Sequence, residues 1–164
     1  TPTDTSIYAN NGTLVSDRTV SQETFSLGFT STATTGTSHF TVDGTTFNVD
    51  AVKKNIGINT ATPVSKLDIN GSFGMPIHGA TANITLNEAH AIVRVNASSN
   101  NVTVTLPAAS TATDRIYSII KSDASSNKVI FSTTVVANGH SFTEVNIPGE
   151  YKIQSDGKNW YLLN

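Results

Sequence analysis

The sequence predicts an all-β protein, and two observations lead to that fold class. The apolar residues are mostly β-branched or aromatic and come in short alternating runs, as half-buried strands require. Asn-Gly and Asp-Gly pairs, which favour tight hairpin turns, recur along the chain. These pairs are Asn11-Gly12, Asp43-Gly44, Asn70-Gly71, Asn138-Gly139 and Asp156-Gly157. Helix signals are nearly absent, so strands must supply the fold.

Residues 1–75 predict a fibre shaft or stem. Their strands are short and weakly apolar, and polar stretches such as residues 30–37 separate them. One copy would bury too little apolar surface to offset its loss of conformational entropy. We therefore expect identical copies to wrap around one axis in an intertwined β shaft. The residues predicted to lie in the shared interface are Phe25, Phe29, Phe40, Phe47, Ile56, Ile58 and Leu67.

Residues 76–164 predict a separate head. The apolar runs are longer and denser here, and Val102, Val104 and Leu106 alternate with threonines. About eight such runs, joined by turn signals, predict a small antiparallel β-sandwich that resembles a jelly roll. We place the boundary between shaft and head at Met75-Pro76.

Composition and charge exclude several classes of protein. The net charge is −2, and Lys53-Lys54 is the only adjacent basic pair, so we expect no nucleic-acid partner. The absence of cysteine excludes disulfides and thiolate metal sites. No apolar stretch is long enough to span a bilayer, and no signal peptide opens the chain, so we expect no membrane insertion. The start at Thr1-Pro2, without Met, predicts a fragment of a longer protein.

The segment from Ile56 to Gly71 has the sequence Ile-Gly-Ile-Asn-Thr-Ala-Thr-Pro-Val-Ser-Lys-Leu-Asp-Ile-Asn-Gly. It resembles a shaft motif of phage tail fibres and related bacterial fibre proteins. That motif runs Gly-Ile-Gly-Thr, two residues, Pro, a few residues, Leu, then Val or Ile and Gly. Asn59 stands where the motif usually has its second Gly. Residues 7–20 resemble the segment that often precedes the motif, and parts of residues 102–161 are similar to the heads of many tail fibres.

This resemblance implies a homotrimer with a shaft and a receptor-binding head, exposed on the surface of a virion. It also implies a structural role in attachment to a host cell-surface glycan or protein, alongside other virion structural proteins. A bacterial surface adhesin or an injection-system fibre would use the same parts. A monomeric module that binds or cleaves carbohydrate is a third interpretation.

Two Ser/Asn-rich loops are the candidate receptor-binding sites. If neighbouring strands of the head alternate in direction, residues 96–101 and 122–127 meet at one end, away from the shaft. Short amide and hydroxyl side chains suit sugar hydroxyls, although the same residues also suit solvated turns. The candidates are Ser98, Ser99, Asn100, Asn101, Asp123, Ser125, Ser126 and Asn127.

The residues predict no enzyme, no cofactor and no metal. The carboxylates are scattered, and no Gly-x-Ser-x-Gly nucleophile motif occurs. Threefold symmetry could assemble a metal site from copies of His39, but a polar strand position is the preferred interpretation. Trp160 could stack on a sugar, but a place in the core is preferred for a lone Trp in the last strand.

Overall fold

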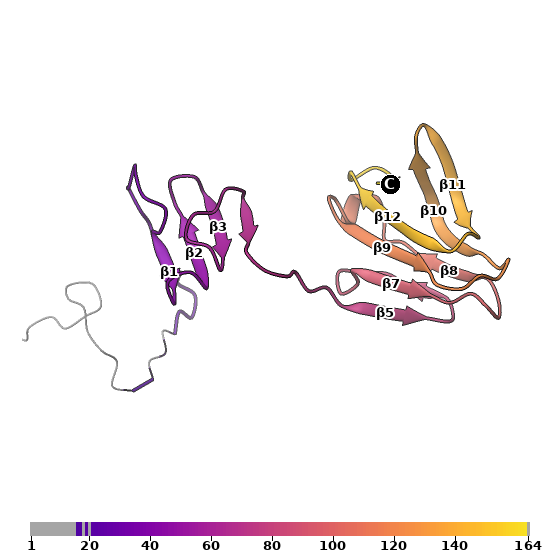
Figure 1. Cartoon of the computed structure of the whole chain (residues 1–164), viewed down its shortest axis with the longest axis horizontal. Helices are drawn as coiled ribbons and strands as arrows, with labels where there is room; N and C mark the ends of the chain where they lie inside the picture. Colours follow the sequence, from indigo (N-terminus) through magenta and orange to yellow (C-terminus); the bar gives the residue numbers. More distant parts are fainter. Residues whose placement is uncertain (1–15, 18, 20, 164) are drawn as a thin grey trace, which may run out of the picture. The chain divides into compact units, whose positions relative to one another are not determined.

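The computed structural model describes residues 16–17, 19 and 21–163, which form β-strands and one short 3-10 turn, Ala109–Thr111. The prediction of an all-β fold is confirmed. The chain divides into two compact units between Ser72 and Phe73 (Figure 1). The boundary predicted at Met75-Pro76 lies a few residues further along the same irregular segment.

The first unit contains one four-stranded sheet with the order β1-β2-β3-β4. Its strands are β1 (Phe40–Val42), β2 (Phe47–Asp50), β3 (Asn55–Ile58) and β4 (Leu67–Ile69). The first two pairs of strands are antiparallel, and β3 pairs with β4 in parallel. The Asp43-Gly44 pair turns the chain between β1 and β2, and both residues have positive φ, as the sequence predicts for such a pair.

The strand register places every apolar side chain of this sheet on the same face. Phe40 lies opposite Val49, Phe47 lies opposite Ile58, and Ile56 lies opposite Leu67. Side chains alternate between the two faces of a strand, so these residues share one side. We call this side the apolar face; it consists of Phe40, Val42, Phe47, Val49, Ile56, Ile58, Leu67 and Ile69.

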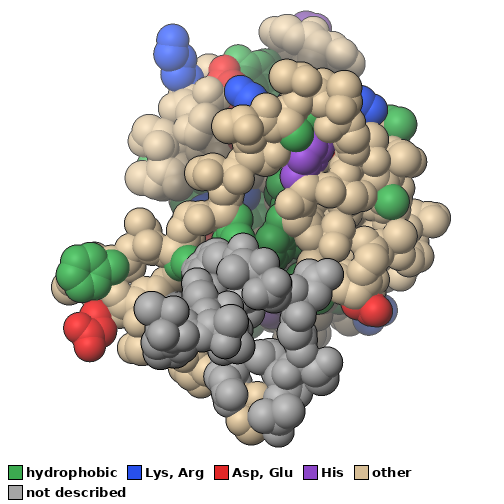
Figure 2. All heavy atoms as spheres, turned by 90° about the vertical axis from the view of Figure 1, so that its left-hand side faces the viewer, with side chains coloured by type: hydrophobic (Ala, Val, Ile, Leu, Met, Phe, Trp, Pro, Cys, Tyr) green, Lys and Arg blue, Asp and Glu red, His purple; other side chains and the backbone are tan. Residues whose placement is uncertain are grey.

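The apolar face is open to solvent in the single chain. Leu67 is 54% exposed and Val42 is 51% exposed. The rings of Phe29, Phe40 and Phe47 follow one another, with centroids 5.0 Å and 6.2 Å apart. All the predicted interface residues lie on this face except Phe25 and Phe29, which precede the sheet and are strongly exposed. Figure 2 shows hydrophobic side chains exposed between uncharged side chains and backbone, with the charged groups mostly toward the edges of the view.

The opposite, polar face is the buried one. Asn48 and Asp50 are fully buried, and Asn55 is nearly so. The amide of Asn48 donates to the carbonyl oxygens of Thr37 and Ala61, and the amide of Asn55 donates to that of Pro63. The segments before β1 and after β3 therefore cover the polar side of the sheet, which reverses the usual arrangement of a half-buried sheet.

Backbone geometry explains two residues of the fibre-like motif, Gly57 and Asn59. A Cβ atom at Gly57 would lie 2.3 Å from the carbonyl oxygen of Thr60, so only glycine fits there. Asn59 has a φ of 57°, a left-handed conformation that Gly and Asn adopt most readily. The departure from the motif at Asn59 therefore keeps the backbone that a glycine would favour.

The second unit contains a nine-stranded sheet with the order β5-β7-β9-β12-β13-β10-β8-β6, in which β11 also pairs with β10. The sheet curls on itself into a nearly closed, barrel-like shape (Figure 1). Its strands are β5 (Ile77–Ala80), β6 (Ile84–Thr85), β7 (Ile92–Val95), β8 (Val102–Thr105), β9 (Ile116–Lys121), β10 (Val129–Ala137), β11 (His140–Val145), β12 (Gly149–Ser155) and β13 (Trp160–Leu162).

The prediction that the head is antiparallel was wrong for most strand pairs. Only β9–β12, β12–β13 and β10–β11 are antiparallel, whereas the other five pairs are parallel. Alternation shows which face of a strand is buried, but it does not show which strand lies beside it. Here β7 pairs with β5 and β9, and β8 pairs with β6 and β10, so the chain crosses over between them. The hairpin predicted at Asn138-Gly139 is confirmed between β10 and β11.

The inside of the curled sheet is a continuous apolar core. Trp160 and Tyr117 are its largest members, fully buried and stacked with ring centroids 5.4 Å apart. The indole N–H of Trp160 donates to the carbonyl oxygen of Pro107, and the Tyr117 hydroxyl donates to that of Asn87. The preferred interpretation of Trp160 as a core residue is confirmed. This unit, unlike the first, encloses its own apolar side chains.

We predict that Gly57→Ala destabilises the first unit, because the added Cβ collides with the backbone of Thr60. Overpacking of this kind costs roughly 1–3 kcal/mol. The measurement is the rate of trypsin cleavage after Lys53 and Lys54, which should rise. Gly71→Ala is the matched control, because no atom lies within 4 Å of its Cβ position. Equal cleavage rates for the two variants would contradict the prediction.

Candidate functional site

Three segments meet at one end of the nine-stranded sheet. Residues 96–101 follow β7 and residues 122–127 follow β9, and these two strands run in parallel with Val95 opposite Lys121. Gly149, at the start of β12, also lies opposite Lys121. We call residues 96–101, 122–127 and 147–149 the loop end. The sequence analysis predicted that residues 96–101 and 122–127 lie at the same end of the head, and they do. It assumed that neighbouring strands are antiparallel, whereas β7 and β9, which precede these loops, are parallel neighbours.

A buried lysine lies at the centre of the loop end. The side chain of Lys121 is 0% exposed, and its ammonium group donates to the Asp123 carboxylate at 2.7 Å. It also donates to the carbonyl oxygens of Asp123 at 3.0 Å and Ser125 at 3.3 Å. Each of the three ammonium hydrogens thus has an acceptor, which is the condition for a charge to remain buried.

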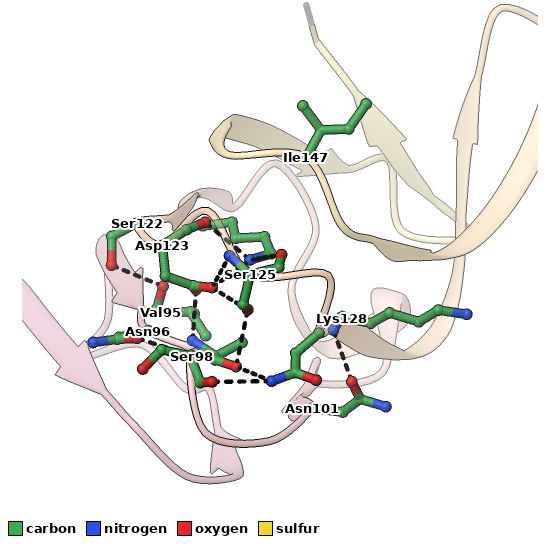
Figure 3. A network of polar contacts seen from close by, with 12 residues as sticks. Val95, Asn96, Ser98, Asn101, Ser122, Asp123, Ser125, Lys128 and Ile147 are labelled. Atoms are coloured by element: carbon green, nitrogen blue, oxygen red, sulfur yellow. Dashed lines mark hydrogen bonds and ion pairs between the residues drawn. The ribbon is translucent and has the colours of Figure 1, made fainter.

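The Asp123 carboxylate links the two loops. One oxygen accepts the backbone N–H of Ala97 at 2.7 Å, and the other accepts the backbone N–H and the hydroxyl of Ser125 (Figure 3). The Lys121 ammonium, followed by these hydrogen bonds, holds the pKa of Asp123 well below its ordinary value. Asp123 is therefore a structural anion.

Two more of the candidate side chains are bound to loop backbone. The amide of Asn127 donates to the carbonyl oxygens of Ala97 at 2.8 Å and Ser98 at 3.2 Å. The side-chain oxygen of Asn101 accepts the backbone N–H of Lys128 at 2.8 Å. Together with Ser125, whose hydroxyl reaches Ala97 O and Asp123, they hold the loops in place.

The remaining candidates face solvent. The four side chains are exposed, and within the described residues they make no side-chain hydrogen bond. We call them the tip residues: Ser98, Ser99, Asn100 and Ser126. They present hydroxyl and amide groups from a backbone that the Lys121–Asp123 network fixes, which is the arrangement expected of a binding loop on a rigid scaffold.

The structure adds an apolar groove that the sequence analysis missed. It has a volume of about 320 Å³ and is lined by Phe142, Glu144, Val145, Asn146, Ile147, Tyr151 and Leu162. Ile147, which is 69% exposed, lies at the loop end (Figure 3), so the groove adjoins that end. The hydroxyl of Tyr151 donates to the carbonyl oxygen of Ile147 at 2.8 Å, and burial raises the pKa of Tyr151. The groove residues come from β11, β12 and β13 and from the segment after β11. Because β11 pairs with β10 and not with β12, alternation within each strand did not indicate the groove.

Two histidines that lie twelve positions apart in the sequence are neighbours in the fold. The ring centroids of His78 and His90 are 4.6 Å apart. His39 belongs neither to the loop end nor to the apolar groove. Its ring nitrogens contact the backbone of Thr35 and Ala51. Within the described residues, no three His, Cys, Asp or Glu side chains lie close enough together to hold a metal ion.

Comparison of the chain with protein-family models, curated proteins and solved structures gives no match. The resemblance to phage tail fibres therefore stays a prediction. Among the described residues, no helix has the length and apolar character needed to cross a membrane.

We predict that Asp123→Asn lowers the melting temperature at pH 7, because it leaves the Lys121 ammonium buried without a counter-charge. Folding lowers the pKa of Asp123, so its contribution is present above the ordinary value of 3.8 and is lost as the pH falls below that value. The difference between variant and wild type should therefore shrink in acid. Fluorescence of Trp160, the only tryptophan, reports the melting.

Ser126→Ala is the matched control for Asp123→Asn, because it changes an exposed residue of the same loop. It should melt with the wild type at every pH. An Asp123→Asn variant that also melts with the wild type at pH 7 would show that the network does not stabilise the loop end.

Proposed function

We propose that this chain is a structural part of a trimeric phage fibre or spike. In this proposal the first unit belongs to the shaft, and the second unit is the head that attaches to glycans on a host cell. The single observation that carries the proposal is the reversed burial of the first sheet: its polar face is covered and its apolar face lies open.

Exposed apolar surface of this extent favours an interface. The apolar face carries no charged side chain, so covering it buries no unpaired ion. Phe29, which is 63% exposed and whose ring lies 5.0 Å from that of Phe40, extends the exposed apolar surface beyond the strands. An identical copy is the partner that this surface fits best, because it exposes the same apolar face. Contact between the copies would remove both faces from water. Most soluble oligomers close around a symmetry axis, and three copies around one axis match the intertwined shaft that the motif implies.

The loop end supports the attachment role of the second unit. The tip residues offer short hydroxyl and amide groups, which match the hydroxyl groups of a sugar in size and in hydrogen-bonding capacity. A single contact of this kind is weak. Three copies of the loop end on one trimer, and several trimers on one particle, would raise the overall affinity by avidity.

Asp123, the carboxylate of the loop end, has no catalytic role in the proposed function. Asp123 accepts hydrogen bonds from Lys121, Ala97 and Ser125, so its pKa is lowered and it is a poor general acid or base near neutral pH. Attachment therefore rests on binding alone.

We predict that Leu67→Asp converts the trimer into single chains. Leu67 lies on the apolar face and is 54% exposed in one copy, so aspartate costs little in a monomer but buries a charge between copies. Light scattering during gel filtration should give about three times 17.3 kDa for the wild type and one third of that for the variant.

Val64→Asp is the control for Leu67→Asp, because Val64 is 85% exposed and lies in the segment between β3 and β4, outside the apolar face. It should keep the trimer mass. A folded wild-type chain with the mass of one copy would instead favour the monomeric carbohydrate-binding module.

We predict that Ser99→Ala combined with Asn100→Ala weakens binding to an array of bacterial surface polysaccharides by about thirtyfold, since each of the two lost hydrogen bonds is worth roughly 1 kcal/mol. The melting temperature should stay the same, because neither side chain bonds to the described part of the chain. Ser110→Ala, an exposed change in the 3-10 turn, is the control. Unchanged binding by the double variant would remove the tip residues from the proposed site.

A further inference from the structure

Two oxygen atoms on the buried polar face of the first sheet lack a hydrogen-bond donor. They are Oδ1 of Asn48 and Oδ2 of Asp50, both on β2, and both residues are 0% exposed. No donor among the described residues reaches either atom. Buried polar atoms are almost always paired, so two unpaired acceptors on one face require a reason.

The orientation of the Asn48 amide is fixed. Its nitrogen donates to the carbonyl oxygens of Thr37 at 2.9 Å and Ala61 at 3.3 Å. Exchanging the nitrogen and oxygen would place the amide oxygen against two carbonyl oxygens, which repel it. The amide oxygen therefore points away from these carbonyls and remains an acceptor without a donor.

Asp50 is a buried carboxylate that pairs with no lysine or arginine of the described residues. Its Oδ1 accepts the backbone N–H groups of Val52 and Lys53, both at 3.0 Å. Its nearest basic group is Nδ1 of His39 at 4.0 Å. That nitrogen lies 3.1 Å from the backbone nitrogen of Ala51, whose N–H it accepts, so it is engaged with the backbone and not with Asp50. Burying a charge without a partner costs several kcal/mol.

We propose that the polar face binds a hard cation of the size of Ca²⁺ through Oδ2 of Asp50 and Oδ1 of Asn48. The two residues are separated by one position on β2, so their side chains lie on the same buried face. Carboxylate and amide oxygens are the ligands that Ca²⁺ prefers, and Ca²⁺ accepts irregular sets completed by carbonyl oxygens and water. A water molecule could donate to both oxygens, but it would leave the carboxylate charge uncompensated.

This cation would stabilise the first unit from its polar side, whereas the proposed trimer contact lies on the apolar face. The inference therefore goes beyond attachment and does not depend on it. A bound cation would explain why this sheet, which is poor in apolar contacts, buries both Asn48 and Asp50 on the same face of β2.

The test uses the full chain, freed of metal with EDTA and then titrated with CaCl₂. We expect isothermal titration calorimetry to give one Ca²⁺ per chain, and circular dichroism to show a melting temperature higher by about 5 °C at saturating Ca²⁺. Asp50→Asn should abolish both effects. Asp43→Asn, a change in the exposed turn before β2, should leave both in place.

Absence of Ca²⁺ binding by the wild-type chain overturns the inference, and so does binding that survives Asp50→Asn. If Asp50→Asn does not fold, Asn48→Ala replaces it and should weaken Ca²⁺ binding at least tenfold; unchanged binding again overturns the inference. Light scattering on the same samples reports the trimer separately, so failure of the cation site and failure of the trimer are distinguishable.

Discussion

The first unit depends on one constraint: its small sheet covers its polar face and leaves its apolar face to solvent. Asn48, Asp50 and Asn55 are held under loops by their own amide and carboxylate contacts, so the sheet cannot turn its apolar side inward without breaking them. Hydrophobic burial, the dominant favourable term in folding, is therefore incomplete for this face in the single chain. In the proposed trimer, identical copies bury it in a shared interior.

The second unit has the opposite character. Its curled sheet encloses the stacked Tyr117 and Trp160, and it needs no partner to bury them. Polar loops are held at one end of this enclosed sheet, where β7, β9 and β12 lie side by side. The Lys121–Asp123 pair ties the two loops together at the cost of burying two charges, which is tolerable because every donor and acceptor in the network is used. The open hydroxyl and amide groups beside it are thereby presented in fixed positions.

The sequence predicted those features that depend on local chemistry. Alternation identified the strands, and Asn138-Gly139 identified its hairpin. The residues from Phe40 to Leu67 that were predicted for an interface between copies lie on one side of the sheet, and the interface itself stays a prediction. Parallel pairing was not predictable, because strands far apart in the chain become neighbours through crossovers that leave no local pattern. At the loop end the sequence predicted that residues 96–101 and 122–127 meet. It did not predict that the Asp123 carboxylate accepts the backbone N–H of Ala97, because a contact between two loops leaves no pattern in either loop.

Sedimentation equilibrium of the unmodified chain, combined with amide hydrogen exchange of β2 and β3, tests the shared interior most directly. The account predicts a mass of about three times 17.3 kDa and slow exchange in these two strands. It also predicts that both are lost together when the sample is diluted until it dissociates. A mass of one chain with the same slow exchange would contradict it, because the first unit would then be ordered while its apolar face is open to water.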